Sequence, residues 1–111
     1  MLNHKEQTMG SRIGPIIIIE DDPDDRDMLM EVLQDLMVPN ELKCFSNAAD
    51  AYSYLEITTD KPFIILSDIN MPVMSGADLK RKINEAAHIR RKSIPFVFLT
   101  TTSAHEAVLD A

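Results

Sequence analysis

Short runs of consecutive apolar residues are the feature of this sequence that most limits its possible folds. Ile16–Ile19, Phe63–Leu66 and Phe96–Leu99 contain no polar residue, and a more polar segment with fewer apolar residues occupies Glu41–Phe45. A strand that is apolar at every position needs cover on both faces, as in a parallel sheet between layers of helices. We therefore expect four strands, most of them buried.

The segments between these runs have the spacing of helices. Residues 23–37 place apolar side chains along one stripe, made by Met28, Leu29, Val32, Leu33, Leu36 and Met37. Asp22 is expected to cap this helix, and Pro23 suits its first position. The basic run Arg90–Lys92 is expected to be a solvated loop. Three more helices are expected: from Ser46 or Asn47 to Leu55, over Ala77–Ala87, and from the capping-box pattern at Ser103 onward.

The alternation of strands and helices predicts an α/β fold with a doubly wound parallel sheet. We expect residues 1–14 to form a flexible N-terminal arm and residues 15–111 to form one domain. In such sheets, ligands bind beyond the carboxyl ends of the strands. The functional residues are therefore sought where the predicted strands end.

The composition of the chain excludes some classes of function. The net charge of -7 and the pI of about 4.8 argue against direct binding of nucleic acid or of an anionic membrane surface. The single cysteine, Cys44, cannot form an internal disulfide, and we interpret it as a strand residue. The first ten residues lack the apolar centre of a signal peptide, so a cytoplasmic location is expected.

Polar residues directly follow three of the predicted strands. Glu20 and Asp21 follow the first, Asp68 follows the third, and Thr100 follows the fourth. In a parallel sheet these positions lie at one edge, where crowded carboxylates repel each other and a hard divalent cation relieves the repulsion. The pattern predicts a Mg²⁺ site. The alternative is a solvated turn in which Asp22 serves only as a helix cap.

Three blocks of sequence resemble response-regulator receiver domains. They are Ile-Ile-Ile-Glu-Asp-Asp-Pro at 17–23, Leu-Ser-Asp-Ile-Asn-Met-Pro-Val-Met-Ser-Gly at 66–76 and Ile-Pro-Phe-Val-Phe-Leu-Thr-Thr at 94–101. They follow the family's order and spacing across residues 15–111. The Glu-Asp-Asp-Pro-Asp-Asp-Arg opening and the Leu-Thr-Thr-Ser ending look most similar to single-domain regulators related to those of cyanobacterial phytochromes.

The resemblance implies a flavodoxin-like sheet in the strand order 2-1-3-4 and a part in two-component signalling. Asp68 matches the phosphoacceptor, and Thr100 matches the switch hydroxyl. Asp21 is similar to the direct Mg²⁺ ligand, Glu20 to the neighbour that often acts through water, and Asn70 to the residue whose main-chain carbonyl completes the metal site. The phosphoryl donor would be a sensor histidine kinase or a phosphotransfer protein. The sequence identifies neither that donor nor the downstream partner. Such a chain catalyses only its own phosphorylation and dephosphorylation.

The sequence departs from the family at its C-terminal end. Receivers have a fifth strand and helix, and a Lys at the end of that strand contacts the phosphoryl group. No Lys of this chain matches that position. We therefore interpret residues 15–111 as a receiver domain that is truncated at its C-terminus. Its fourth strand would be an exposed apolar edge, and we expect a homodimer or a strand-exchanged oligomer.

Two other functions stay open. A Mg²⁺-dependent enzyme, either a haloacid-dehalogenase-like phosphatase or a Toprim-type nuclease, also uses carboxylates at strand ends. The phosphatase pattern has a second Asp two residues after the nucleophile, where this chain has Asn70. A degenerate receiver that only binds a partner is the other alternative. It would bind the metal without forming a phosphorylated product.

Overall fold

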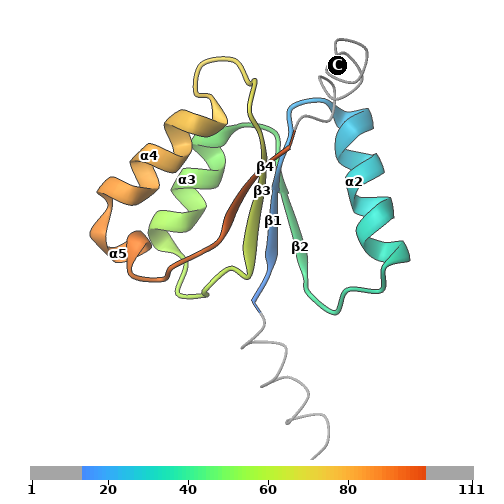
Figure 1. Ribbon diagram of the computed structural model, residues 1–111, viewed down its shortest axis with the longest axis horizontal. Coiled ribbons are helices and arrows are strands. Elements are labelled where there is room, and N and C mark those ends of the chain that lie inside the picture. The colour runs from blue at the N-terminus through green and yellow to red at the C-terminus, as the bar shows by residue number, and fades with distance from the viewer. Residues whose placement is uncertain (1–13, 100–111) are drawn as a thin grey trace, which may run out of the picture.

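The computed structural model describes residues 14–99, and its strands and helices alternate along the chain (Figure 1). In order they are β1 (Ile16–Ile19), α2 (Pro23–Asp35), β2 (Leu42–Phe45), α3 (Ala48–Ile57), β3 (Ile64–Asp68), α4 (Gly76–Glu85), α5 (Ala87–Arg90) and β4 (Phe96–Leu99). Residues 1–13 of the predicted arm and the predicted helix from Ser103 lie outside the described residues. No helix within residues 14–99 combines the length and the apolar character needed to cross a membrane.

The four strands form one parallel sheet in the order β2-β1-β3-β4, which confirms the predicted flavodoxin-like order. In its register, Ile18 lies between Cys44 on β2 and Leu66 on β3, and Leu66 is in turn level with Val97 on β4. Helices α3, α4 and α5 cover one face of the sheet, and α2 lies against the other (Figure 1). The sheet is therefore wound on both sides.

The main core lies between the sheet and helices α3, α4 and α5. Ile17, Ile19 and Ile65 point from the sheet into it, and none of the three is exposed. The helices contribute Ala48, Ala51, Leu55, Leu79, Ile83 and Ile89. Full burial of an Ile or Leu side chain stabilises the fold by about 1.5–3 kcal/mol relative to exposure. This layer holds the central strands β1 and β3 in place.

The other face of the sheet is only partly covered, because the apolar stripe of α2 is not fully buried and the helix ends at Asp35 rather than at the predicted residue 37. No residue of α2 is buried, and Met28 and Val32 are each 49% exposed. Met30 Sδ lies 3.3 Å from Cys44 Sγ, so α2 packs over the β2 side of the sheet. A helix about 10 Å wide covers roughly two strands spaced about 4.8 Å apart. The β3–β4 half of this face consequently receives no helix from residues 14–99.

The N-terminus of α4 carries a cap that the sequence reasoning did not identify. Ser75 Oγ accepts the Asp78 N–H at 3.1 Å, and the Asp78 carboxylate accepts the Ser75 N–H at 3.3 Å. These two bonds form a capping box, and the helix begins at Gly76 rather than at the predicted Ala77. The hydrogen bonds from Ser75, with a smaller effect of Arg81, lower the pKa of Asp78.

The predicted solvated loop at Arg90–Lys92 is observed only in part, since Arg90 and Arg91 are exposed but Arg90 is helical and Lys92 is engaged. Arg90 ends the short helix α5, and Lys92 Nζ donates hydrogen bonds to the main-chain oxygens of Thr58 at 2.9 Å and Asp60 at 2.7 Å. Those carbonyls follow the end of α3. Lys92 therefore ties the C-terminal end of α3 to the segment that leads into β4.

Replacing Ser75 with Ala removes the bond from the Asp78 N–H to Ser75 Oγ and leaves the bond from the Ser75 N–H to the Asp78 carboxylate in place. We expect Ser75→Ala to lower the free energy of unfolding by about 1 kcal/mol, the usual value of a lost N-cap. Urea unfolding followed by circular dichroism measures it. The control is Ser53→Ala, which changes an exposed position within α3. Equal unfolding midpoints for the two variants would contradict this role of Ser75.

Candidate functional site

The candidate site lies where β1 and β3 end side by side. Ile19 is level with Ser67 in the register of these strands, so Glu20 and Asp68 follow at the same height. Glu20, Asp21 and Asp68 each place a carboxylate oxygen within 4.8 Å of the others. Glu20 is 1% and Asp68 5% exposed, whereas Asp21 is open to solvent. The predicted convergence of these three residues is therefore observed.

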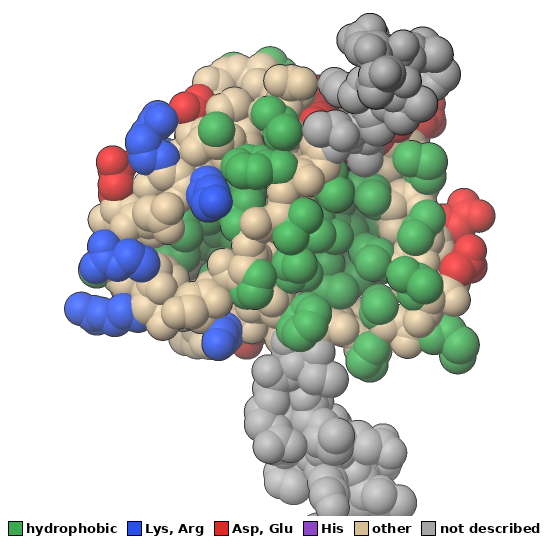
Figure 2. Space-filling model, viewed as in Figure 1, with side chains coloured by type: hydrophobic (Ala, Val, Ile, Leu, Met, Phe, Trp, Pro, Cys, Tyr) green, Lys and Arg blue, Asp and Glu red, His purple; other side chains and the backbone are tan. Residues whose placement is uncertain are grey.

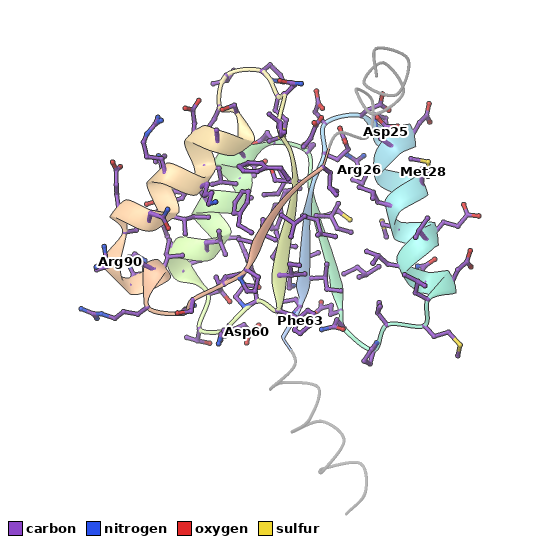
Figure 3. All side chains as sticks on the ribbon, in the orientation of Figure 1. Asp25, Arg26, Met28, Asp60, Phe63 and Arg90 are labelled. Atoms are coloured by element: carbon purple, nitrogen blue, oxygen red, sulfur yellow. The ribbon has the colours of Figure 1, made fainter. Side chains whose placement is uncertain are left out.

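Main-chain and side-chain donors hold this cluster in place. The Asn70 N–H donates to Asp68 Oδ1 at 3.3 Å, and the Asp22 N–H donates to Glu20 Oε2 at 3.1 Å. Arg26 Nη1 donates to the main-chain oxygen of Glu20 at 3.0 Å. In Figure 3, Arg26 extends from α2 toward the strands. The first turn of α2 is thereby tied to the end of β1.

Asp22 has the structural role that the sequence suggested. It is the N-cap of α2, and its Oδ1 accepts the N–H of Asp24 at 2.8 Å and that of Asp25 at 3.4 Å. Its carboxylate is thus engaged by the helix rather than by the acidic cluster. This separates Asp22 from its neighbours Glu20 and Asp21.

The loop after β3 brings Gly76 close to the main chain of Asp68 and Ile69. The Gly76 N–H donates to the main-chain oxygen of Ile69 at 3.1 Å. A Cβ on Gly76 would lie 2.6 Å from the main-chain oxygen of Asp68 and 3.0 Å from Ser67 Oγ. Gly76 is therefore required by the close approach of two main-chain segments, one of which carries Asp68.

The same loop contains a strained residue beside an apolar pocket. Val73 has a φ of +71° and a fully exposed side chain, and the Met74 N–H donates to the Pro72 oxygen at 2.8 Å across it. A β-branched residue rarely adopts this conformation. The pocket, of about 280 Å³, is lined by Asn47, Ala48, Ala49, Pro72, Val73 and Met74. The sequence reasoning missed it because no periodicity brings these two loops together.

The predicted roles of Asn70 and Thr100 both stay predictions. Asn70 is exposed, and its main-chain N–H contacts Asp68; its role as a carbonyl ligand stays a prediction. Thr100 lies outside the described residues, so its role as the switch hydroxyl stays a prediction too. The described part of the site is thus three carboxylates at the ends of two parallel strands.

The family model described as the response regulator receiver domain matches residues 16–111. The chain belongs to this family. Among curated relatives, it is 32% identical over 85 residues to response regulator Rre1 of Synechocystis sp., covering 77% of this chain and 35% of that protein. It is 27% identical over 99 residues to response regulator Rcp1 of the same organism, covering 85% of this chain and 66% of that protein.

Solved receiver structures agree with this placement. The bacteriophytochrome response regulator AtBRR superposes with a TM-score of 0.72 at 24% identity, covering 88% of this chain and 74% of that one. The receiver domain of sensor histidine kinase PA1611 from Pseudomonas aeruginosa PAO1, with magnesium coordinated in its active-site cleft, has a TM-score of 0.64 at 24% identity. That match covers 81% of this chain and 70% of the other. The predicted likeness to cyanobacterial and phytochrome-linked regulators is confirmed.

Gly76→Ala tests the packing behind Asp68 of this receiver domain. Helix propensity alone would make the variant more stable by about 0.5–1 kcal/mol. The contact with the main-chain oxygen of Asp68 should instead destabilise it by about 1–3 kcal/mol, as overpacking does. The sign of the change in a thermal unfolding experiment decides between the two.

The reverse change one residue later is the control. Ala77→Gly removes a methyl group from an exposed position, so only the loss of helix propensity is expected there. An unchanged or raised melting temperature for Gly76→Ala would show that a Cβ at position 76 is accommodated beside the main-chain oxygen of Asp68.

Proposed function

We propose that Asp68 accepts a phosphoryl group from the phosphohistidine of a partner protein and that this reaction needs Mg²⁺. One observation carries the proposal. Asp68 is a nearly buried carboxylate at the end of a central strand, with the carboxylates of Glu20 and Asp21 within 4.8 Å. Such an arrangement attracts a divalent cation, and the bound cation would offset the repulsion between the carboxylates and an incoming phosphoryl group.

The donor set suits Mg²⁺. This ion prefers carboxylate and carbonyl oxygens and keeps several waters and a phosphate oxygen in its shell. Glu20, Asp21 and Asp68 supply hard oxygen donors, and the exposure of Asp21 leaves one side open to solvent. We propose that these three residues and the main-chain carbonyl of Asn70 hold the ion. When bound, Mg²⁺ would offset the negative charge on the phosphoryl oxygens.

The residues of this chain then carry out the transfer. An Asp68 carboxylate oxygen attacks the phosphorus of the phosphohistidine; a P–O bond forms and the P–N bond breaks. The imidazole leaves with the electron pair of that bond and takes up a proton. The Asn70 N–H, bonded to Asp68 Oδ1, orients the attacking carboxylate. In-line positioning of this kind is most of what phosphoryl transfer asks of a protein.

Phosphorylation would affect the rest of the domain through the negative charge that it adds. An acyl phosphate on Asp68 adds negative charge at the ends of β1 and β3. Thr100 directly follows β4, and we propose that its hydroxyl moves to donate a hydrogen bond to the new phosphoryl group. Repacking around that movement would change binding to a downstream partner. A sensor histidine kinase or a phosphotransfer protein is the proposed donor.

Mg²⁺ is expected to stabilise the folded chain through its carboxylates. A ligand present at 100 times its dissociation constant stabilises the folded state by about 2.7 kcal/mol. The melting temperature of the chelator-treated chain should therefore rise on addition of Mg²⁺. Asp68→Asn should melt higher than the unmodified chain without metal, because one repelling charge is gone. It should lose most of the response to Mg²⁺.

Asp60→Asn is the matched control, since Asp60 lies in an exposed loop after α3. It should respond to Mg²⁺ as the unmodified chain does. A full response of Asp68→Asn would place the metal elsewhere and remove Asp68 from the proposed ligand set.

Phosphorylation is tested with the small donor acetyl phosphate. In the presence of Mg²⁺ the intact mass should increase by one phosphoryl group, and hydroxylamine should remove the adduct because it is an acyl phosphate. Chelation of Mg²⁺ should prevent the adduct. Asp68→Asn should not form it, and Asp60→Asn should.

The alternatives give different results in the same experiment. A degenerate receiver would show the Mg²⁺-dependent rise in melting temperature without any adduct. That result would overturn the proposed acceptor role of Asp68. A phosphatase would turn over a phosphate ester many times per chain, which would contradict the receiver function rather than the acceptor role of Asp68.

A further inference from the structure

Val73 combines an exposed apolar side chain with a strained main chain. Its φ of +71° and the hydrogen bond from the Met74 N–H to the Pro72 oxygen make residues 72–74 a γ-turn of the rare, strained kind. Within residues 14–99, the other left-handed residues apart from glycine are Met37 and Ser93. Both lie just after a helix, where this conformation is common. Val73 instead lies in a loop that follows a strand.

The packing of the loop explains the turn but not the valine. Met71 is 9% exposed and Met74 packs against the core, and the chain reverses between them. Pro72 cannot make the reversal, because its ring fixes φ at a negative value. A glycine at position 73 would make the same turn without the penalty of a Cβ. Val73 is fully exposed, so its side chain adds no buried contact in return. A strained residue of this kind is typical of a functional site.

Val73 also forms part of the wall of the apolar pocket of about 280 Å³. Helix α3 contributes Ala48 and Ala49 to this pocket, and the loop contributes Pro72 and Met74. Figure 2 shows that apolar side chains also gather between β4 and α2, so exposure alone does not mark a binding surface. At Val73 exposure coincides with backbone strain and with a pocket that is wide enough for one aliphatic side chain.

The pocket lies at the same edge of the sheet as the acidic cluster. β2 ends at Phe45 just before α3, β3 ends at Asp68, and the loop between β3 and α4 stands beyond the strand ends (Figure 1). Val73 follows Asp68 by five residues, so the two are at most about 17 Å apart. A protein interface covers about 800 Å² on each partner, a patch about 30 Å across. A protein centred on Asp68 would therefore reach Val73.

The surroundings of the pocket are acidic. Asp50 lies in the first turn of α3 and is exposed, and so are Asp21 and Asp24 beside the acidic cluster. The chain as a whole has a net charge of -7. A partner with Lys or Arg around its contact surface is complementary to this edge of the sheet. The charges thus favour a basic protein as the occupant.

We propose that Val73 and the pocket beside it bind an apolar side chain of the phosphoryl-donor protein, whose surface around the phosphohistidine is basic. This inference rests on the proposed function, because it assumes that a donor protein brings its phosphohistidine to Asp68. The pocket fixes the orientation of the donor, and Val73 adds apolar contact that a glycine would not supply. Val73 is then a specificity-determining residue, and the chemistry stays with Asp68.

Three phosphoryl donors test the proposal. They are phosphoimidazole, a lysine-rich helical peptide with a phosphohistidine inside a stripe of leucines, and a twin peptide with glutamines in place of the leucines. A stripe of about three turns on each side of the histidine reaches about 16 Å along the helix. Intact mass gives the rate of adduct formation with each donor. Each peptide rate is divided by the phosphoimidazole rate, so that any change in the reactivity of Asp68 itself cancels.

On the unmodified chain, the leucine peptide should give a ratio about tenfold above that of its twin, because an apolar side chain is buried in the pocket. Val73→Ser and Ala49→Leu should each lower the ratio to about that of the twin. The first removes the apolar side chain of Val73, and the second fills the pocket while keeping its surface apolar. Ile57→Ser is the control, since Ile57 is 82% exposed at the other end of α3; it should keep the full ratio.

Thermal unfolding of Val73→Gly separates binding from folding. This variant should melt at least as high as the unmodified chain, because the strain is relieved and no buried contact is lost. A marked fall in its melting temperature would show that Val73 serves the fold and would overturn the proposal.

Equal ratios for the two peptides on the unmodified chain would also overturn it, as would a full ratio for Val73→Ser or Ala49→Leu. If phosphoimidazole leaves no adduct on Asp68, the proposed function fails and this inference fails with it. An adduct from phosphoimidazole together with equal peptide ratios removes only the docking role of Val73.

Discussion

The parallel pairing of β1 with β3 is the constraint on which the rest of the structure depends. It ends the two strands at one level, with Ile19 beside Ser67, and so brings Glu20 and Asp68 together from distant parts of the sequence. The buried layer of Ile17, Ile19 and Ile65 under α3, α4 and α5 fixes that register. A shift by one residue would reverse the faces of β3 and separate the carboxylates. The geometry of the acidic cluster is therefore a consequence of how the core packs.

The elements that the sequence predicted well are those with strong local signals. β1 and β4 have the predicted bounds because each is an unbroken apolar run. Asp22 caps α2 as expected, because an Asp directly before Pro at the first helical position is a strong start signal. The convergence of Glu20, Asp21 and Asp68 followed from strand alternation alone. The family resemblance assigned their individual roles.

The features that the sequence reasoning missed depend on tertiary packing. The periodicity of residues 23–37 predicted the apolar stripe on α2 but not how little of it is buried, because periodicity does not say how much of a sheet one helix can cover. Lys92 was assigned to a solvated loop, whereas it donates to carbonyls of Thr58 and Asp60 more than thirty residues away. The pocket between the N-terminus of α3 and Val73 joins two loops with no shared pattern. Such contacts are visible only when the chain is folded.

The central proposal for this protein is that Asp68 forms the acyl phosphate. The most direct test is to phosphorylate the chain with acetyl phosphate and Mg²⁺, reduce it with borohydride, and map the product by peptide mass spectrometry. Borohydride converts an aspartyl phosphate to homoserine. The account predicts homoserine at position 68, with Glu20 and Asp21 unchanged. Reduction at Asp21 or at another acidic residue, with Asp68 intact, would contradict it.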